Sequence, residues 1–577
     1  MTPRAEDTPL RADNAPLRAD DGGRVPPVDA DGEAFTAAAA AGDSISVAAW
    51  TMVSRMTGVL RVIAIGAVLG PTLLGNTFQF TNALPNLVYY GFLAGSLFSS
   101  LLVPALVPSM DAGDRRSAER IAGGFLGVTL AALAVAAVSA VLLGPLVLKL
   151  GALGTQQQAV SASQERMGRW LLVLLMPQVL FYAVVGASTA VMNARRRFAL
   201  AAAAPAVENV GILVVLAMSA AWYGTEATGD DAPMGQLLLL GLGATVAVGA
   251  HAALQWWGAN HVGVTLLPRA GWRHPEVTAL VRRTVPALGL AGLTALQLLT
   301  LLVLGNRVPG GVVSLQVGLT FYFFLIALGV TPVALSLLPR LARLHRRHEQ
   351  TLFRETLVRG VALALFLTVP GVLGYLAIST QLAEVMSIGK MGSATGTALV
   401  AASMLSLGPG ILGETVFVIA TYAFYARQQT RPPLRSMMVQ AVCFMALAGL
   451  TFLVRGIAVP IVLGLAWSVA SIVGAWHLVA SLRKIVEGVV TPLGPPLRRI
   501  ALAAVVMVVP VRAVAELVPR WVDGRLGSSV AVVAAVAVGA AVFLLLQALW
   551  HAPELAWVSG GMVQVRRRVR PGGGGIA

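Results

Sequence analysis

Apolar stretches of about 20 residues recur along this 577-residue chain from Ser44 almost to its end. Each stretch is long enough to cross a bilayer, because an α-helix rises about 1.5 Å per residue and the hydrocarbon core is about 30 Å thick. Only 12% of the residues are charged, which is roughly half the share in a soluble domain, and the mean hydropathy is +0.78. The sequence therefore predicts an all-α, polytopic membrane protein.

The connections between the apolar stretches alternate in charge. Charged or Gly/Pro-rich breaks separate about fourteen predicted spans, and arginine clusters fall in every second connection. The arginine-bearing segments are 115–120, 195–197, 269–283, 340–354, 427–435, 483–499 and 566–570. Because positively charged loops stay in the cytoplasm, this alternation predicts an even number of spans and places both termini in the cytoplasm.

The two ends of the chain differ from the rest. Residues 1–43 are polar and rich in Asp, Arg, Pro and Ala, so they bury too little apolar surface to fold and are predicted to form a disordered cytoplasmic tail. They lack the basic-then-apolar order of a signal peptide. Residues 552–577 are predicted to form a second, C-terminal cytoplasmic tail.

Several kinds of chemistry find no support in the sequence. The net charge of +16 is explained by arginines that hold the membrane topology, and no nucleic-acid motif accompanies it. Cys443 is the single cysteine, which excludes an intrachain disulfide. There is no Walker A sequence, no zinc-protease motif and no catalytic constellation, so we expect no enzyme, cofactor or metal. His251 is interpreted as a polar packing residue rather than a proton site.

Two arginines lie inside the first predicted span. If this helix enters the membrane near Ser44, Arg55 lies roughly 16 Å along it, near the bilayer centre, and Arg61 roughly 25 Å. An arginine at mid-span costs at least about 2.5 kcal/mol and normally faces protein or water. One interpretation is that Arg55 or Arg61 binds an anion in a polar cavity, since guanidinium suits phosphate. The alternative is a structural ion pair with Glu208 or Glu414, the two acids placed within spans.

Five blocks in order give the chain a family resemblance. NARRRFALAAAAPAVEN resembles the pattern N-x-x-x-R-F-x-x-x-x-x-x-P-x-x-x-N of the MurJ (MviN) lipid II flippase family. The first span matches the family's S-R-x-x-G-x-x-R, and the second span matches its block around Pro85 and Asn86. Two shorter blocks are LLPRLAR at 337–343 and FYARQQTRPP at 424–433. The resemblance covers about residues 45–435.

The resemblance implies a transporter of the multidrug/oligosaccharidyl-lipid/polysaccharide exporter superfamily with 14 spans. Its six-helix lobes would be residues 44–258 and 259–484 around a central cavity, with two extra helices in 485–551. It also implies that Arg55 and Arg61 face the cavity and contact the pyrophosphate of a lipid carrier. Asn86 and Asn209, with Pro85, are interpreted as packing or gate residues.

The chain departs from the family at cavity positions. The family usually has an acid where this chain has Asn76, and an arginine pair where it has Tyr89 and Tyr90. An acid is replaced by Ala94, another by Val62, and an Asp-Arg pair by Leu319 and Thr320. Each lost charge-assisted hydrogen bond is worth about 1.5–3 kcal/mol, so these changes weaken pyrophosphate recognition.

The leading hypothesis is a flippase that moves lipid-linked peptidoglycan precursor across the bacterial cell membrane by alternating access. A second hypothesis is an exporter of another lipid-linked oligosaccharide or amphiphile, which would suit a cavity poorer in cations. A third is a non-transporting membrane scaffold that recruits cell-wall or division proteins through its tails. The expected partners are an anionic lipid-linked substrate and membrane lipids.

Overall fold

The structure is a computed structural model that describes residues 30–93, 102–152, 158–195, 197–224, 232–273, 275–486, 488–489 and 491–555. Within these ranges only the backbone is described at 30–48, 90–93, 147, 150–152, 158–161, 273, 276, 279–288 and 491. Most of the predicted N-terminal tail and residues 556–577 of the predicted C-terminal tail lie outside the described residues.

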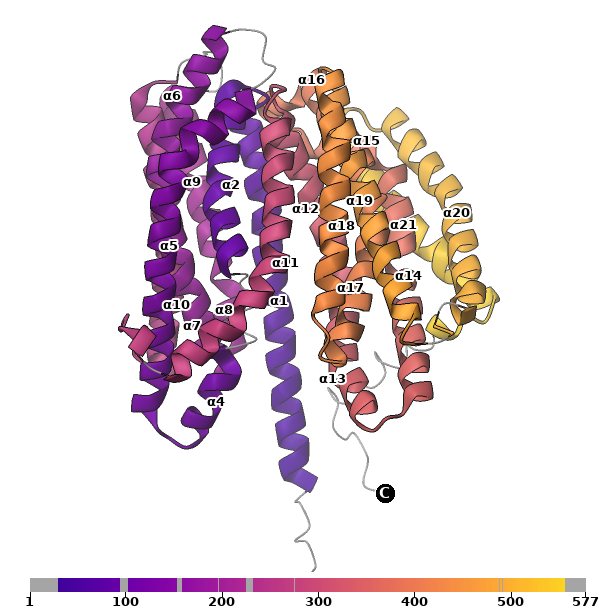
Figure 1. The fold of residues 1–577 in the computed structure, drawn as a ribbon. Helices are drawn as coiled ribbons and strands as arrows, with labels where there is room; N and C mark the ends of the chain where they lie inside the picture. The colour runs from indigo at the N-terminus through magenta and orange to yellow at the C-terminus, as the bar shows by residue number, and fades with distance from the viewer. Residues whose placement is uncertain are drawn as a thin grey trace, which may run out of the picture.

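The first half of the described chain is a series of helices (Figure 1). Their bounds are α1 (Ala30–Val68), α2 (Leu73–Leu93), α4 (Val103–Asp111), α5 (Arg115–Ala152), α6 (Gln158–Leu175), α7 (Gln178–Ala194), α8 (Phe198–Ala203), α9 (Pro205–Tyr223) and α10 (Met234–His261). Prolines set two of these boundaries, because a proline lacks the amide hydrogen that continues a helix. Pro177 separates α6 from α7, and Pro205 begins α9.

The second half continues in the same way, and the described residues include no strand. The 3₁₀ turns are η2 (Gly271–Arg273), η3 (Gly389–Gly392), η4 (Gly449–Leu453), η5 (Thr491–Leu493) and η6 (Val518–Arg520). The helices are α11 (Pro275–Gly305), α12 (Gly311–Gly329), α13 (Thr331–Arg346), α14 (Gln350–Ala377), α15 (Ser379–Met386), α16 (Ala394–Leu407), α17 (Gly410–Ala426), α18 (Arg431–Ala448), α19 (Ala458–Arg483), α20 (Gly494–Leu517) and α21 (Gly524–Leu549). The all-α prediction is thus confirmed.

Many of these helices are membrane spans by length and composition. In the described residues, 11 helices are long and apolar enough to cross a membrane, or 12 if α16 and α17, which meet at a 41° bend, form one broken span. The other two predicted spans correspond to α2 and to α11, whose Gly289–Gly305 part is a shorter apolar helix. The protein is therefore a multi-pass membrane protein, and the count of fourteen stays a prediction.

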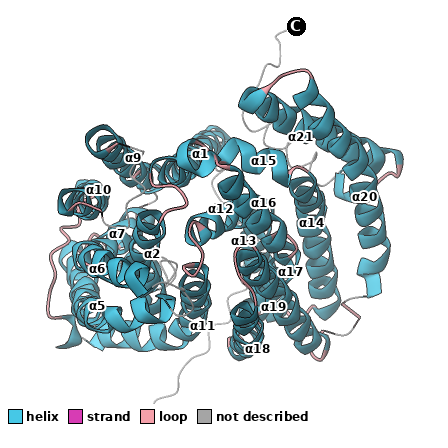
Figure 2. Ribbon diagram, turned by 90° about the horizontal axis from the view of Figure 1, so that it is seen from above, coloured by secondary structure: helices cyan, strands magenta, loops and turns pink. Residues whose placement is uncertain are grey.

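The helices form two groups that lie side by side (Figures 1 and 2). One group contains α2, α5–α7, α9 and α10; the other contains α12–α19, with α20 and α21 packed outside it on α14 and α15. Two helices contact both groups: α1 packs on α9 and α12, and α11 packs on α2, α5 and α18. Any movement of one group relative to the other must therefore involve α1 and α11.

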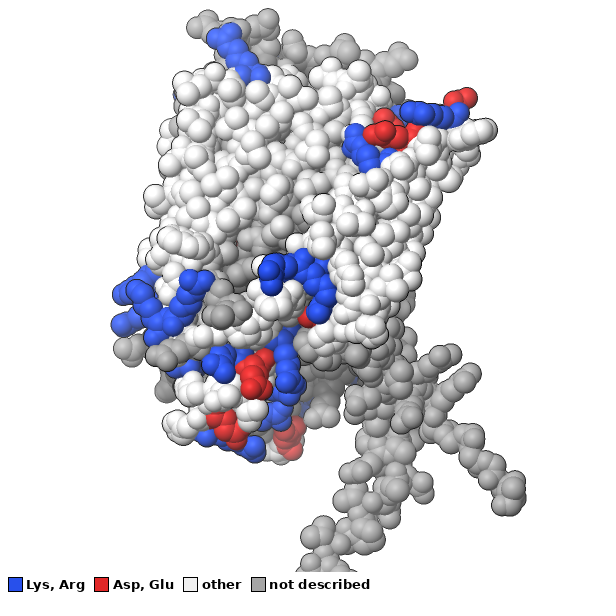
Figure 3. Space-filling view, turned by 90° about the vertical axis from the view of Figure 1, so that its right-hand side faces the viewer, with Lys and Arg blue, Asp and Glu red and all other residues white. Residues whose placement is uncertain are grey.

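The predicted arginine-rich connections meet one another in space. Glu119, at the start of α5, binds Arg115 at 2.9 Å and Arg269 at 3.4 Å. Arg427 bonds to Gln350 at 3.4 Å, which joins two further arginine-rich connections. Figure 3 shows the same pattern on one face, where a broad band without charged side chains separates a Lys/Arg-rich lower end from an upper end with fewer charges. This distribution is the one expected if the apolar band faces the lipid and the charged ends face water.

Candidate functional site

Both arginines lie on α1, whose part with described side chains includes the apolar stretch Ala49–Val68. Arg61 pairs with Glu208, which lies inside the apolar span Phe198–Tyr223 formed by α8 and α9. Arg61 therefore lies well inside the membrane. The position of Arg55 near the bilayer centre stays a prediction.

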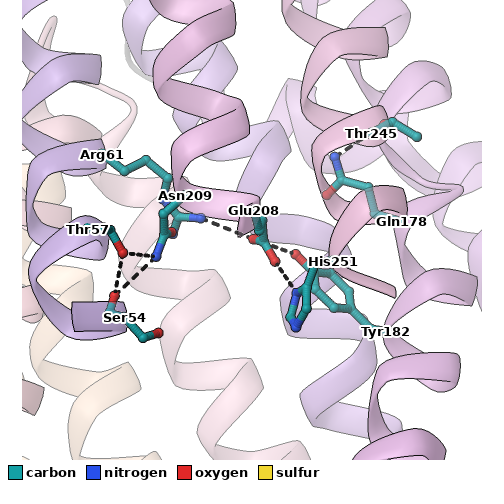
Figure 4. A network of polar contacts seen from close by, with 9 residues as sticks. All are labelled: Ser54, Thr57, Arg61, Gln178, Tyr182, Glu208, Asn209, Thr245 and His251. Atoms are coloured by element: carbon teal, nitrogen blue, oxygen red, sulfur yellow. Dashed lines mark hydrogen bonds and ion pairs between the residues drawn. The ribbon is translucent and has the colours of Figure 1, made fainter. Parts of the chain in front are cut away.

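Arg61 belongs to a polar network between α1 and the first helix group (Figure 4). Its Nη1 donates to Oε1 of Glu208 at 3.1 Å. The Tyr182 hydroxyl donates to the same oxygen at 3.3 Å, and His251 Nδ1 lies 3.0 Å from Oε2. The Glu208 side chain is only 10% exposed, and that of His251 5%. Four helices, α1, α7, α9 and α10, thus meet at one buried carboxylate.

Local structure explains why Glu208 can stay charged at this depth. Pro205 starts α9 after the short helix α8, so Glu208 lies in the first turn of α9. A helix N-terminus carries a partial positive charge and unpaired amide hydrogens, which favour a carboxylate nearby. The arginine, the tyrosine hydroxyl and the histidine supply the remaining donors. Burial of this charge is tolerated because it is paired and hydrogen-bonded.

Part of the hydrogen-bonding capacity of this network is unused. Nε of Arg61 and Nε2 of His251 are both buried, and neither has a hydrogen-bond partner among the described residues. The Arg61 side chain is 21% exposed, so it is held by Glu208 on one side and open on another. Arg61 therefore keeps donors for a further acceptor, and His251 keeps one ring nitrogen for a further hydrogen bond.

Asn209 fixes α1 against α9 one residue after Glu208. Its Nδ2 donates to the Ser54 carbonyl and to the Thr57 hydroxyl, both at 3.2 Å, and Thr57 donates to the Ser54 carbonyl at 2.9 Å. These bonds hold residues 54–57 of α1, about one to two helical turns before Arg61 (Figure 4). Asn209 thus sets how α1 lies on α9.

Arg55 differs from Arg61 in its surroundings. Its side chain is exposed, and in the part of the chain that the structure describes no ion pair or side-chain hydrogen bond to it is found. Six residues of helix turn the side chain by about 240°, so Arg55 and Arg61 leave α1 in different directions. The two guanidinium groups therefore do not share a partner: Arg61 contacts Glu208, and Arg55 does not.

The other predicted residues are spread over both helix groups. Pro85 is buried inside α2, and Asn86 beside it is half-buried. Glu414 lies on α17 in the second group, half-buried, and the described residues provide it with no ion pair. Between the two candidate acids, Arg61 is therefore paired with Glu208 and not with Glu414.

Residues at the departure positions are apolar or form local bonds. Tyr89 is buried, and its ring centre lies 5.6 Å from that of Tyr182, which itself bonds to Glu208. Leu319 is buried, and the Thr320 hydroxyl donates to a carbonyl of its own helix. The Tyr90 side chain and Ala94 lie outside the described residues. Where the resemblance predicts an arginine, Tyr89 instead packs on Tyr182.

Asn76 joins the two helix groups at the end away from the arginine-rich connections. It is fully buried near the start of α2; its Nδ2 donates to the Val308 carbonyl at 2.7 Å, and its Oδ1 accepts from the Val312 amide at 3.3 Å. At the same end, Gln164 of α6 donates to Asn306 after α11 at 2.9 Å. The two groups are therefore closed against each other at this end.

Replacing Asn76 with alanine is expected to open this end, because two buried bonds worth about 1–3 kcal/mol in total are lost. In a Cys443→Ser background, Val308→Cys would report the opening, since Val308 is only 8% exposed. We expect Asn76→Ala to raise its maleimide labelling rate at least about fivefold. Thr320→Ala, which removes only a bond within α12, is the control. An unchanged rate would show that Asn76 does not hold the closure.

Two members of the network were not predicted as partners of Glu208. His251 was interpreted as a packing residue, and Tyr182 was not considered. The one available signal for His251 was its position, seventeen residues into the 28-residue helix α10, because an ionisable side chain at mid-membrane depth is usually functional. Tyr182 gave no signal, since a tyrosine in an apolar helix is common and only the fold shows that it faces Glu208.

Comparisons with known proteins agree with this architecture. The family model "Lipid II flippase MurJ" matches residues 65–548. "Probable lipid II flippase MurJ" of Vibrio cholerae is 24% identical over 398 residues, which are 68% of this chain and 73% of that protein. The protein of the same name from Bdellovibrio bacteriovorus is 26% identical over 491 residues, which are 81% of this chain and 87% of that protein.

Solved structures show the same fold. "Lipid II flippase MurJ, inward closed conformation" aligns with a TM-score of 0.68 at 14% identity, over 88% of this chain and 99% of that one. An inward-facing multidrug-resistance MATE transporter of the MOP superfamily aligns with a TM-score of 0.59 at 12% identity, over 77% of this chain and 99% of that one. With a family model that matches most of its length, the chain belongs to the lipid II flippase MurJ family.

Proposed function

We propose that this protein moves a lipid-linked peptidoglycan precursor, a lipid II-like molecule, across the bacterial cell membrane. The observation that carries the proposal is Arg61, an arginine inside a membrane span that is paired but still has a buried donor without a described partner. A charge at this depth is expensive to keep and normally serves transport. A pyrophosphate diester offers the acceptor oxygens that the open side of a guanidinium group can bind.

The proposed mechanism is alternating access between residues 44–258 and 259–484, with the helices of 485–551 outside. We place the arginine-rich end in the cytoplasm, following the positive-inside rule. The Asn76 contacts would then close the outer side, and Arg55 would lie exposed toward the cytoplasmic side of α1. In this assignment Arg55 meets the anionic head group first, and Arg61 binds it deeper in the membrane.

A second candidate is the export of a less anionic amphiphile. The observation that favours it is Tyr89, which is buried against Tyr182 at a position where the family resemblance leads us to expect an arginine. An aromatic pair cannot compensate phosphate charge, but it can pack on an apolar or sugar surface. The two candidates therefore differ in whether a pyrophosphate is required in the substrate.

Complementation separates these candidates. The native lipid II flippase of a bacterium would be depleted, this full-length chain expressed, and lipid II on the outer leaflet measured. We expect lipid II exposure and growth to be restored. Normal expression and membrane insertion without any lipid II exposure would contradict the proposal and favour the less anionic substrate.

The proposed orientation can be tested with cysteine labelling in a Cys443→Ser background. Gln429 is exposed between α17 and α18 at the arginine-rich end, and Asp523 is exposed between α20 and α21 at the other end. We expect Asp523→Cys to react with a membrane-impermeant maleimide in whole cells, and Gln429→Cys to react only after permeabilisation. The reverse pattern would place the arginine-rich end outside.

A further inference from the structure

Glu208 occupies the position that an anionic ligand would take on Arg61. It is an internal anion that contacts the guanidinium through one oxygen only, at 3.1 Å. Its second oxygen already faces another potential cation, His251, at 3.0 Å. The carboxylate therefore lies between two partners, and it can lose the first while keeping the second.

The surroundings of His251 allow it to serve as the second cationic partner of Glu208. When its Nδ1–H donates to Glu208, its Nε2 carries a lone pair, and this nitrogen is buried with no described partner. Imidazole is the side chain that most readily gains a proton between pH 5 and 8. Uptake of a proton would give an imidazolium that binds Glu208 by a charge-assisted hydrogen bond.

We propose that the Arg61–Glu208–His251 cluster is a proton-binding site, in which a phosphate group of the ligand replaces Glu208 on Arg61 while His251 takes up a proton and retains Glu208. The proposal rests on the proposed function, because it assumes an anionic ligand at Arg61. It adds three elements to that function: Glu208 is displaced from Arg61, His251 compensates the charge of Glu208, and a proton is bound together with the ligand.

The charges of the cluster explain why the two binding events are coupled. In the proposed ligand-free state, Arg61 and Glu208 neutralise each other and His251 carries no extra proton. A phosphate that takes over Arg61 leaves a buried carboxylate with only neutral partners, which is costly. One proton on His251 removes this cost. Three titratable groups of the described residues face Glu208: Arg61 of α1, His251 of α10 and Tyr182 of α7. The short helix α8, which also packs on α9, contributes none.

Linkage fixes the sign of the pH effect. If anion binding is accompanied by proton uptake, the proton strengthens anion binding by the same factor, so affinity rises as pH falls. One proton per ligand changes Kd by at most about tenfold per pH unit. The proton that is taken up is assigned to Glu208 and His251 together, because the two groups interact closely.

The number of protons can be measured directly. The purified full-length protein in lipid nanodiscs would be titrated by calorimetry with a short-chain prenyl-pyrophosphoryl-N-acetylglucosamine, whose pyrophosphate diester does not itself titrate near neutral pH. Repeating the titration in two buffers of different ionisation enthalpy gives the protons taken up per ligand. We expect a value between about one half and one at pH near 7.5 for the wild type.

Two variants test the roles of the partners. His251→Gln keeps a donor for Glu208 but cannot take up a proton, so we expect weaker binding and proton uptake near zero. Glu208→Gln removes the internal anion, so we expect binding to be several-fold tighter and independent of pH. Glu414→Gln, a carboxyl change in a span of the other helix group, is the matched control and should behave like the wild type. If His251→Gln does not insert, His251→Asn replaces it.

The possible outcomes distinguish the proton-binding site from the proposed function. Ligand binding without proton uptake in the wild type, or with the same uptake in His251→Gln, would overturn the proton site and leave the proposed function intact. Weaker binding in Glu208→Gln would overturn the displacement of Glu208. Absence of any binding by a well-folded wild type would overturn the anionic ligand, and the proton site with it.

Discussion

Replacing Arg61 with glutamine is expected to destabilise the protein by about 3 kcal/mol. The change leaves Glu208, whose side chain is only 10% exposed, without its charged partner. Replacing Glu208 with glutamine in the same chain removes the orphaned charge, so the double variant should be more stable than Arg61→Gln alone. The pair should therefore show strong coupling in a double-mutant cycle.

The measurement is apparent thermal unfolding in nanodiscs of the wild type, both single variants and the double variant. We expect the melting temperature of Arg61→Gln to fall by several degrees and most of this loss to be recovered in the double variant. Arg169→Gln, which breaks the exposed pair with Glu165 on α6, is a suitable control with little expected effect. Additive effects of the two single changes would show that the ion pair contributes little to folding.

The second large effect is expected at Arg55, and it should concern function alone. The side chain is exposed and the described residues give it no partner, so Arg55→Ala should leave expression and melting temperature unchanged. If Arg55 contacts the head group, its loss removes a charge-assisted interaction worth about 1.5–3 kcal/mol, which corresponds to roughly ten- to hundredfold weaker binding. Lipid II exposure in the complementation assay should fall accordingly.

Arg359→Ala is the matched control for Arg55. Its side chain is also exposed, at 62%, and forms only a 3.8 Å contact with Glu355 one helical turn away. We expect no change in lipid II exposure for this variant. Full activity of Arg55→Ala would exclude a role for Arg55 in substrate binding, whereas loss of expression would show that it serves folding.

The helical architecture and the clustering of positive connections were predictable from sequence. Both follow from local properties: apolar runs of sufficient length and arginines at their ends. The contact of Glu119 with Arg269, two residues from distant predicted connections, agrees with the predicted alternation.

The partner of Arg61 could not be decided from sequence. Glu208 and Glu414 were equally suitable by type and by predicted depth, and the choice depends on α9 packing against α1, which no local pattern encodes. The contact of His251 with Glu208 was not predicted for the same reason, because it exists only when α10 packs beside α9. Pairing of intramembrane charges is therefore a property of tertiary structure.

Asn76 gives the closed end of the molecule a particular character. The side-chain amide of Asn76 binds a backbone carbonyl and a backbone amide, so this contact carries no net charge. Its strength therefore does not depend on ionic strength or on the membrane potential. Hydrogen bonds of this kind weaken steeply with distance and angle. The Asn76 hydrogen bonds are therefore either formed or broken, with few intermediate states. We expect the closed end to change between two states, closed and open.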